Sequence, residues 1–241
     1  MATFTITAPA DRSRVSLGGN GGLPPGRGGH SDSDYFAMRL RRARLGLVVA
    51  VVGIVMIFIS FTSAYVVRQG LPTFDPRTNR LVHDWSPVRL PALLLINTFV
   101  LLISSLTMEL ARRRAARDVM LEQVTSIRAA SRRSDNRISW LALTVVLGLS
   151  FLIGQLMVWR ELAATGFYVA SSPSSSFVYL LTGVHGVHLL GGVLALLAAG
   201  AASLLKQPAD SRYVVLDVTG WYWHFMAALW VYIFCLLEFV R

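Results

Sequence analysis

Three histidines in apolar surroundings are the residues of this chain best suited to chemistry. His185 and His188 stand three positions apart, so on a helix their side chains share one face. His224 lies in a separate apolar run near the C-terminus. Histidine binds both transition metals and haem iron, and an ionisable side chain inside a membrane is a functional candidate by default. These imidazoles therefore either hold a cofactor or hold helices together.

The residues around the histidines favour the structural role. After His188 the same helix face continues through small residues, among them Gly192 and Ala195. Small residues in a membrane helix mark close helix–helix packing, so this face is expected to point into the bundle. The apolar runs offer no further strong ligand group, and the two histidine-bearing runs place their imidazoles at different predicted depths. We therefore expect hydrogen bonding by these histidines, with no metal ligand, no cofactor ligand and no catalytic residue.

The composition indicates that membrane helices position these side chains. Of the 241 residues 54% are hydrophobic and 15% are charged, and the mean hydropathy is +0.54. A soluble chain carries about a quarter charged residues. The single cysteine, Cys235, excludes a disulfide scaffold and an iron–sulfur cluster. The 23 basic residues lie mainly beside apolar runs, so we interpret them as determinants of topology and expect no nucleic-acid partner.

Five charge-free apolar runs predict five transmembrane helices, because a helix needs about 20 residues to cross the hydrocarbon. Backbone groups in lipid must bond internally, so the predicted fold is an all-α integral membrane bundle. The predicted membrane domain covers residues 45–241, with spans at about 45–67, 90–108, 138–158, 177–205 and 218–237. Good helix formers after the second span predict that its helix continues to about Ile127.

Residues 1–44 are rich in glycine, proline and arginine and are predicted to form a flexible tail. The first apolar run is too long for the core of a cleaved secretory signal, and a mitochondrial transit peptide is the alternative interpretation of the tail. With the N-terminus inside, the inner segments hold 17 basic residues and the outer segments hold 6. The positive-inside rule therefore predicts the N-terminus inside and the C-terminus outside.

Two further features bear on function. The aromatic run at 221–223 is expected to anchor the fifth span at the inner membrane surface, with a bound lipid packed against Trp223 as the alternative. No carboxylate lies inside a predicted span, since the four nearest ones fall at span ends: Glu109, Glu161, Asp217 and Glu238. Ion-coupled transporters usually place acids within the membrane, so this pattern argues against the second hypothesis, a transporter or channel with a midplane site.

Two runs of residues resemble the signatures of a known family. The run from Thr182 to Gly192, TGVHGVHLLGG, is similar to the TGxHGxHxxGG signature of subunit III of the haem–copper oxidases. The run WYWHF at 221–225, followed by Trp230, resembles the signature of that family's last helix. Weaker resemblances lie in the first three spans, at Ser63–Tyr65, Asn97–Thr98, Ser104–Ser105, Leu147–Gly148 and Gln155. The resemblance covers about residues 45–241.

The resemblance implies a membrane bundle of seven helices, or of five where the first two are missing, and five are predicted here. It implies a non-catalytic accessory subunit of a respiratory terminal oxidase, with no active site of its own, that packs against subunit I in a complex with subunit II. Haem and copper then belong to the partner subunits, and this chain holds no cofactor apart from phospholipid in a cleft. The implied role is to support assembly and sustained proton uptake.

The implied location is the bacterial plasma membrane. Cytochrome c or quinol would meet the complex only through partner subunits, and cytochrome c is favoured because it is the more frequent donor in the family. A subunit III-like component of a nitric oxide reductase is the third hypothesis, which only the identity of the partner would separate from an oxidase.

Three acids that are common in the family are missing from this chain. The corresponding regions are occupied by the run Gly53–Val55, by Val158 and by the run Met226–Ala228. Roles of those acids therefore do not transfer to this protein. The residues expected to serve structure or lipid contact are His185, His188, His224, Trp223, Gly192 and Ala195.

Overall fold

The computed structural model describes residues 27–75, 79–82, 85, 91–122, 127–204 and 209–240. The helices within these ranges are α1 (Arg27–Gly70), α2 (Ala92–Glu122), α3 (Ile127–Ala164), α4 (Pro173–Leu204) and α5 (Ala209–Phe239). Two short strands, β1 (Thr73–Asp75) and β2 (Arg80–Val82), lie between α1 and α2. The chain divides into two compact units, residues 1–38 and residues 39–241, and the helices that pack together belong to the second.

Five helices in the described part of the chain are long and apolar enough to cross a membrane, which confirms the prediction of an all-α, five-helix membrane bundle. Their membrane-length segments are Asp34–Gly70, Ala92–Arg117, Ser139–Ala164, Pro173–Ala202 and Ser211–Phe239. The protein is therefore a multi-pass membrane protein. The orientation of its termini stays a prediction.

The helices extend well beyond the apolar runs. α1 begins at Arg27, within the stretch that the sequence predicts to be a flexible tail, and alanine, leucine, methionine and arginine at 37–44 favour a helix there. The rest of the predicted tail, residues 1–26, lies outside the described residues. α2 continues to Glu122, close to the predicted end at Ile127, and residues 123–126 are again outside the described part.

The connection between α1 and α2 contains a hairpin that the sequence did not lead us to predict. β1 and β2 pair antiparallel, with Thr73 opposite Val82 and Phe74 opposite Leu81. Asn79 lies in the turn with a φ of 51°, a left-handed conformation that asparagine tolerates better than most residues. Strands of three residues are too short for the alternating pattern that identifies a strand in a sequence.

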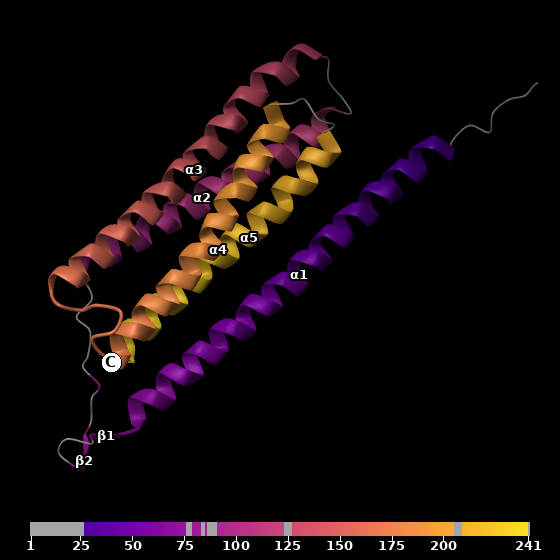
Figure 1. The fold of residues 1–241 in the computed structure, drawn as a ribbon. Helices are drawn as coiled ribbons and strands as arrows, with labels where there is room; N and C mark the ends of the chain where they lie inside the picture. Colours follow the sequence, from indigo (N-terminus) through magenta and orange to yellow (C-terminus); the bar gives the residue numbers. More distant parts are fainter. Residues whose placement is uncertain are drawn as a thin grey trace, which may run out of the picture. The chain divides into compact units, whose positions relative to one another are not determined.

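Helices α2 to α5 pack side by side (Figure 1): α2 lies against α3 and α5, and α4 lies against the same two helices. Within residues 39–241, α1 is joined to these helices by side chains. Phe58 meets the ring of His188 edge-on, with centroids 6.3 Å apart, and the Tyr65 hydroxyl donates to the Val240 carbonyl oxygen at 2.8 Å. Among the described residues from 39 onwards, no Cα atom of α1 comes within 8 Å of one in α2 to α5.

Trp223 of α5 occupies the centre of the four-helix packing and is completely buried. A Cβ atom added at Gly148 of α3 would lie 2.7 Å from its ring, and one added at Gly192 of α4 would lie 3.2 Å away. The indole Nε1 donates to the Ser104 hydroxyl of α2 at 3.2 Å, and that hydroxyl donates in turn to the Thr144 carbonyl oxygen of α3. One side chain thus contacts all three neighbouring helices.

Two more indoles make the same kind of contact. Trp230 of α5 donates to the Thr98 hydroxyl of α2 at 2.9 Å, and Trp159 of α3 donates to the Thr182 hydroxyl of α4 at 3.1 Å. Each hydroxyl donates onward to a carbonyl oxygen one turn earlier in its own helix. Because lipid offers no hydrogen bonds, these pairs satisfy buried polar groups while they join helices.

We predict that Gly192→Leu destabilises the protein and that Gly191→Leu on the next residue does not. The first substitution forces side-chain atoms into Tyr222 and Trp223, whereas nothing lies within 4 Å of a Cβ atom at Gly191. Overpacking of this kind costs about 1–3 kcal/mol. Thermal unfolding of the two variants in detergent, followed by circular dichroism, measures the difference, and equal unfolding temperatures would contradict the packing described here.

Candidate functional site

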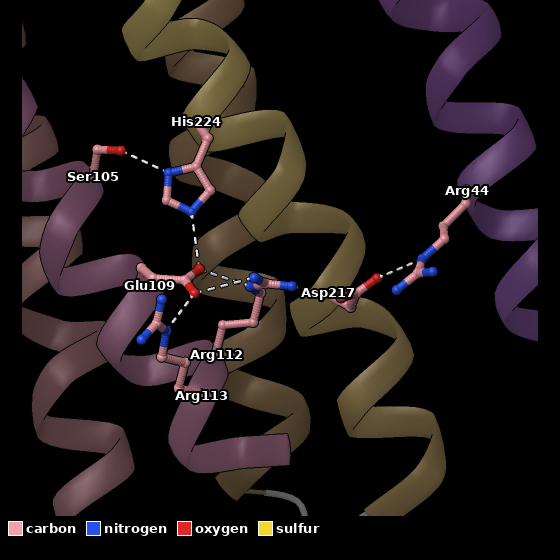
Figure 2. Close-up of polar contacts among 7 residues, drawn as sticks. All are labelled: Arg44, Ser105, Glu109, Arg112, Arg113, Asp217 and His224. Atoms are coloured by element: carbon pink, nitrogen blue, oxygen red, sulfur yellow. Dashed lines mark hydrogen bonds and ion pairs between the residues drawn. The ribbon is translucent and has the colours of Figure 1, made fainter. Parts of the chain in front are cut away.

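A cluster of charged and polar side chains near Arg44 is the candidate functional site (Figure 2). We call it the ion-pair cluster, and its members are Arg44, Ser105, Glu109, Arg112, Arg113, Asp217 and His224. They come from three helices that are distant in sequence. α1 supplies one arginine, α2 supplies the serine, the glutamate and two arginines, and α5 supplies the aspartate and the histidine.

His224 joins α5 to α2 through both ring nitrogens. Its Nε2 lies 3.3 Å from Glu109 Oε2, and its Nδ1 lies 2.6 Å from Ser105 Oγ (Figure 2). A carboxylate only accepts, so Nε2 carries the hydrogen in this pair, and in the neutral ring Nδ1 accepts from the serine hydroxyl. The expected structural role of His224 thus has a specific geometry, because the imidazole bridges two α2 side chains one turn apart.

Asp217 is the buried charge of the cluster, with no exposed side-chain surface. Its Oδ2 accepts from Arg44 Nε at 2.9 Å, and its Oδ1 accepts from an Arg112 terminal nitrogen at 3.2 Å. One carboxylate of α5 therefore pairs with an arginine on α1 and another on α2. Removing a charge from water is costly, and these two guanidinium groups are the partners that compensate for it.

Glu109 links the two parts of the cluster. Both of its oxygens accept from Arg112, at 2.9 and 3.1 Å, and Oε1 also accepts from Arg113 at 2.7 Å. Arg112 thereby pairs with Glu109 and Asp217 at once, so the polar contacts run without interruption from Ser105 to Arg44. With His224 neutral, three guanidinium groups face two carboxylates, and the cluster carries one positive charge in excess.

The contacts from a serine to a histidine to a carboxylate resemble those of a hydrolase catalytic triad. The geometry argues against hydrolysis at this cluster. Ser105 stands inside the α2 helix, where the backbone N–H groups around it bond within the helix and offer no oxyanion hole. Glu109 is neutralised by two arginines, which weakens its support of a histidine that must become positive. The arrangement is suited to holding helices together.

His185 lies where the sequence placed it, completely buried inside the bundle, but without the predicted hydrogen bond. Among the described residues, neither ring nitrogen has a hydrogen-bond partner. The imidazole packs against aromatic rings instead, with centroids 6.0 Å from Phe151 of α3 and 5.1 Å from Trp230 of α5. The expectation of hydrogen bonding stays a prediction at this residue, whose position on α4 meets two aromatic rings.

His188 is half-buried and faces α1. Its Nδ1 donates to the Val184 carbonyl oxygen of its own helix at 2.8 Å, and its ring contacts Phe58. Tyr222 of α5 donates to the His188 backbone carbonyl oxygen at 2.9 Å. The two histidines of the signature run therefore do not converge on one point, and His188 contributes to packing between α1 and α4.

The aromatic run at 221–223 divides between two environments. Trp223 is enclosed by protein, so the alternative that a lipid packs against it is wrong, as is its place in a surface belt. Trp221 is 52% exposed and suits the predicted interfacial anchor. Of the two small residues singled out on α4, Gly192 is buried against aromatic rings, and Ala195 is half-buried.

The sequence did not lead us to the charged members of the cluster. Glu109 and Asp217 were assigned to span ends, and the sequence did not predict that they would pair with arginines of other helix turns and other helices. A local signal exists for Glu109, because Arg112 and Arg113 follow it at helical pair spacings. Asp217 has no local signal, since Arg44 lies 173 residues away. Across the described residues, no three histidine, cysteine, aspartate or glutamate side chains form a group that could hold a metal ion.

The chain is similar to one family in its sequence. A family model described as cytochrome c oxidase subunit III matches residues 32–240. "Probable cytochrome c oxidase subunit 3" of Mycobacterium tuberculosis is 31% identical over 102 residues, which cover 42% of this chain and 50% of the relative. The match thus spans about half the length of that relative. Cytochrome c oxidase subunit 3 of Branchiostoma floridae is 28% identical over 207 residues, which cover 84% of this chain and 70% of the relative.

We predict that Asp217→Asn destabilises the bundle by about 3–5 kcal/mol, because it leaves two guanidinium groups without their shared carboxylate. Exposed Glu161→Gln on α3 is the control and should change stability little. Unfolding in detergent of increasing denaturing strength, followed by tryptophan fluorescence, measures both. An Asp217→Asn variant as stable as the control would show that the ion pairs contribute nothing to the fold.

We predict that His185→Phe leaves the stability unchanged or raises it. The ring nitrogens of His185 have no hydrogen-bond partner in the described part of the chain, so an apolar ring of similar shape loses no partner there. His185→Ala, in contrast, opens a cavity between Phe151 and Trp230 and should cost about 2–5 kcal/mol. The same unfolding measurement compares them, and a loss with phenylalanine as large as with alanine would mean that the imidazole has a polar role.

Proposed function

The chain belongs to the cytochrome c oxidase subunit III family, and from this membership we propose that it is a non-catalytic accessory subunit of a respiratory haem–copper terminal oxidase. It packs against the catalytic subunit I, in a complex that includes subunit II. In this role it supports assembly, binds lipid and sustains proton uptake while oxygen is reduced. Its location is the bacterial plasma membrane, and cytochrome c reaches the complex through the partner subunits.

The contacts that the signature residues make between helices support this proposal. Thr182 accepts from Trp159, Trp223 reaches α2, α3 and α4, and His224 bridges α5 to α2. These three signature side chains are engaged in contacts between helices. A subunit whose task is to present a fixed membrane surface to a larger enzyme needs this kind of internal order.

Haem and copper belong, in this proposal, to the partner subunits. The described histidines do not suit haem ligation. Both nitrogens of His224 are engaged by α2 side chains, and the nitrogens of His185 lie in a space enclosed by Phe151 and Trp230. His188 donates from Nδ1 to its own helix and meets Phe58. No redox step is therefore assigned to this chain.

Copurification tests the proposal. A tag on this chain, followed by extraction in a mild detergent, should recover a haem-bearing subunit whose reduced spectrum matches that of the membrane and whose preparation consumes oxygen. Recovery of this chain without any haem protein would overturn the proposal. Recovery with an enzyme that reduces nitric oxide in place of oxygen would reassign the chain to the related reductase.

The same preparation gives a prediction for His188→Leu. The substitution removes the aromatic contact with Phe58 and the hydrogen bond to Val184, so it should lower the amount of assembled complex. Oxygen consumption per haem should be unchanged, because the side chain touches no redox centre. Exposed Val187→Leu is the control on the neighbouring residue. A collapse of turnover in a fully assembled complex, with an altered haem spectrum, would contradict the structural role.

A further inference from the structure

Two buried polar side chains inside the bundle have no hydrogen-bond partner among the described residues. They are Gln155 of α3, which is 4% exposed, and His185 of α4, which is completely buried. The amide oxygen and nitrogen of Gln155 and both ring nitrogens of His185 are concerned. Burying a polar group without a hydrogen bond is costly, so nearly all such groups in proteins have a partner, either protein or ordered water.

Contacts between α3 and α4 place these two side chains at the same level of the bundle. Trp159 of α3 donates to Thr182 of α4, and the Phe151 ring of α3 meets the His185 ring of α4. Residue numbers thus fall along α3 while they rise along α4, so the two helices are antiparallel. Gln155 is halfway between Trp159 and Phe151 in α3, and it therefore lies between the levels of Thr182 and His185.

The direction of the side chains brings the two polar groups closer. In an α-helix every Cα–Cβ bond is tilted toward the N-terminus of its own helix. Since α3 and α4 are antiparallel, the Cα–Cβ bond of Gln155 is tilted toward the level of His185. The bond of His185 is tilted in the opposite direction, toward the level of Gln155. The amide and the imidazole therefore approach one another across the interface of α3 and α4.

The polar groups around this pair are used in other hydrogen bonds. Trp230, whose ring centroid lies 5.1 Å from that of His185, donates its N–H to Thr98. The Thr182 hydroxyl accepts from Trp159 and donates to a carbonyl oxygen one turn earlier in α4. A partner shared by the amide and the imidazole therefore has to be a small molecule that enters the bundle.

The chemistry of the pair selects water as that molecule. The amide of Gln155 offers an acceptor and two hydrogens, and the neutral ring of His185 offers one acceptor and one hydrogen. Neither group carries a charge that would balance an ion, and an uncompensated charge inside a membrane is costly. A water molecule both donates and accepts, and buried waters typically make about three hydrogen bonds.

We propose that one water molecule binds between Gln155 and His185 and links α3 to α4. It supplies at this level of the interface what the bond between Trp159 and Thr182 supplies at the next. The site is independent of the proposed role in an oxidase, because it lies within this chain. His185→Phe exchanges one hydrogen bond to this water for an apolar ring, and these effects on stability have opposite signs. Spectroscopy of the ring is therefore the more direct test.

Solid-state NMR of the full chain in lipid bilayers, with ¹⁵N-labelled histidine, tests the site. The chain has five histidines, and the signals missing from His185→Phe assign the ring of His185. In the wild type the acceptor nitrogen of this ring should resonate upfield of a free imidazole nitrogen, because it accepts a hydrogen bond. The ring should also receive magnetisation from a water molecule that stays bound.

Two neighbouring substitutions on α3 separate the site from the rest of the bundle. Gln155→Met keeps a side chain of similar length without the amide groups. It should return the acceptor nitrogen of His185 toward the resonance of a free ring and remove most of the transfer from water. Leu156→Met is the matched control, because Leu156 is 55% exposed, and it should leave both signals as in the wild type.

A density map of the wild-type chain in the complex purified from its native membrane tests the same site without any substitution. At a resolution that shows ordered water, one peak should lie within hydrogen-bond distance of both Gln155 and His185. The inference would be overturned by a map without this peak, by a direct bond between the amide and the ring, by a wild-type ring with the resonances of free imidazole, or by equal spectra of Gln155→Met and Leu156→Met.

Discussion

The insertion of Trp223 between three helices is the constraint on which the rest of the structure depends. Its ring fits because Gly148 and Gly192 lack side chains at the two places where α3 and α4 approach it. Its Nε1–H would be a costly unpaired group in a membrane interior, and the Ser104 hydroxyl removes that cost. Two glycines, one serine and one indole thus fix the relative positions of α2, α3, α4 and α5. The neighbouring contacts, such as Tyr222 with the His188 carbonyl oxygen, follow from the same register.

The sequence signatures of this family describe packing in this protein. Association of helices in lipid lacks the hydrophobic driving force that acts in water, so close contacts and hydrogen bonds decide which surfaces meet. Thr182 and Thr98 accept from indoles on neighbouring helices, and Asn97 donates to the Phe151 carbonyl oxygen of α3 at 3.1 Å. These threonines and asparagines are small enough to sit between helices and polar enough to join them. Residues that look like parts of a binding site in the sequence are therefore parts of the bundle's own interior.

Sequence reasoning succeeds where a single helix carries the information. Apolar runs of membrane length predicted five helices, and the small residues after His188 predicted that its helix face turns inward, as Gly192 does. It fails where the information belongs to pairs of helices. Consecutive residues on a helix point about 100° apart, so the run at 221–223 could not all face lipid, and the sequence does not say that Trp223 is the residue that turns inward. The burial of Asp217 depends on Arg44 and Arg112 from two other helices. No local sequence pattern predicts these ion pairs between helices.

The distance along the chain between Arg44 and Asp217 sets an order of events during biosynthesis. The two residues are 173 positions apart, so at about 5–20 residues per second roughly 10–35 s pass between their emergence from the ribosome. Arg44 lacks its carboxylate partner Asp217 throughout that interval. α5 follows the other four described helices in the chain, and it carries Trp223, His224 and Asp217 together. The four-helix packing therefore closes only once α5 has been made, and a nascent chain that stops before α5 lacks both the Arg44–Asp217 ion pair and the Tyr65 hydrogen bond to Val240.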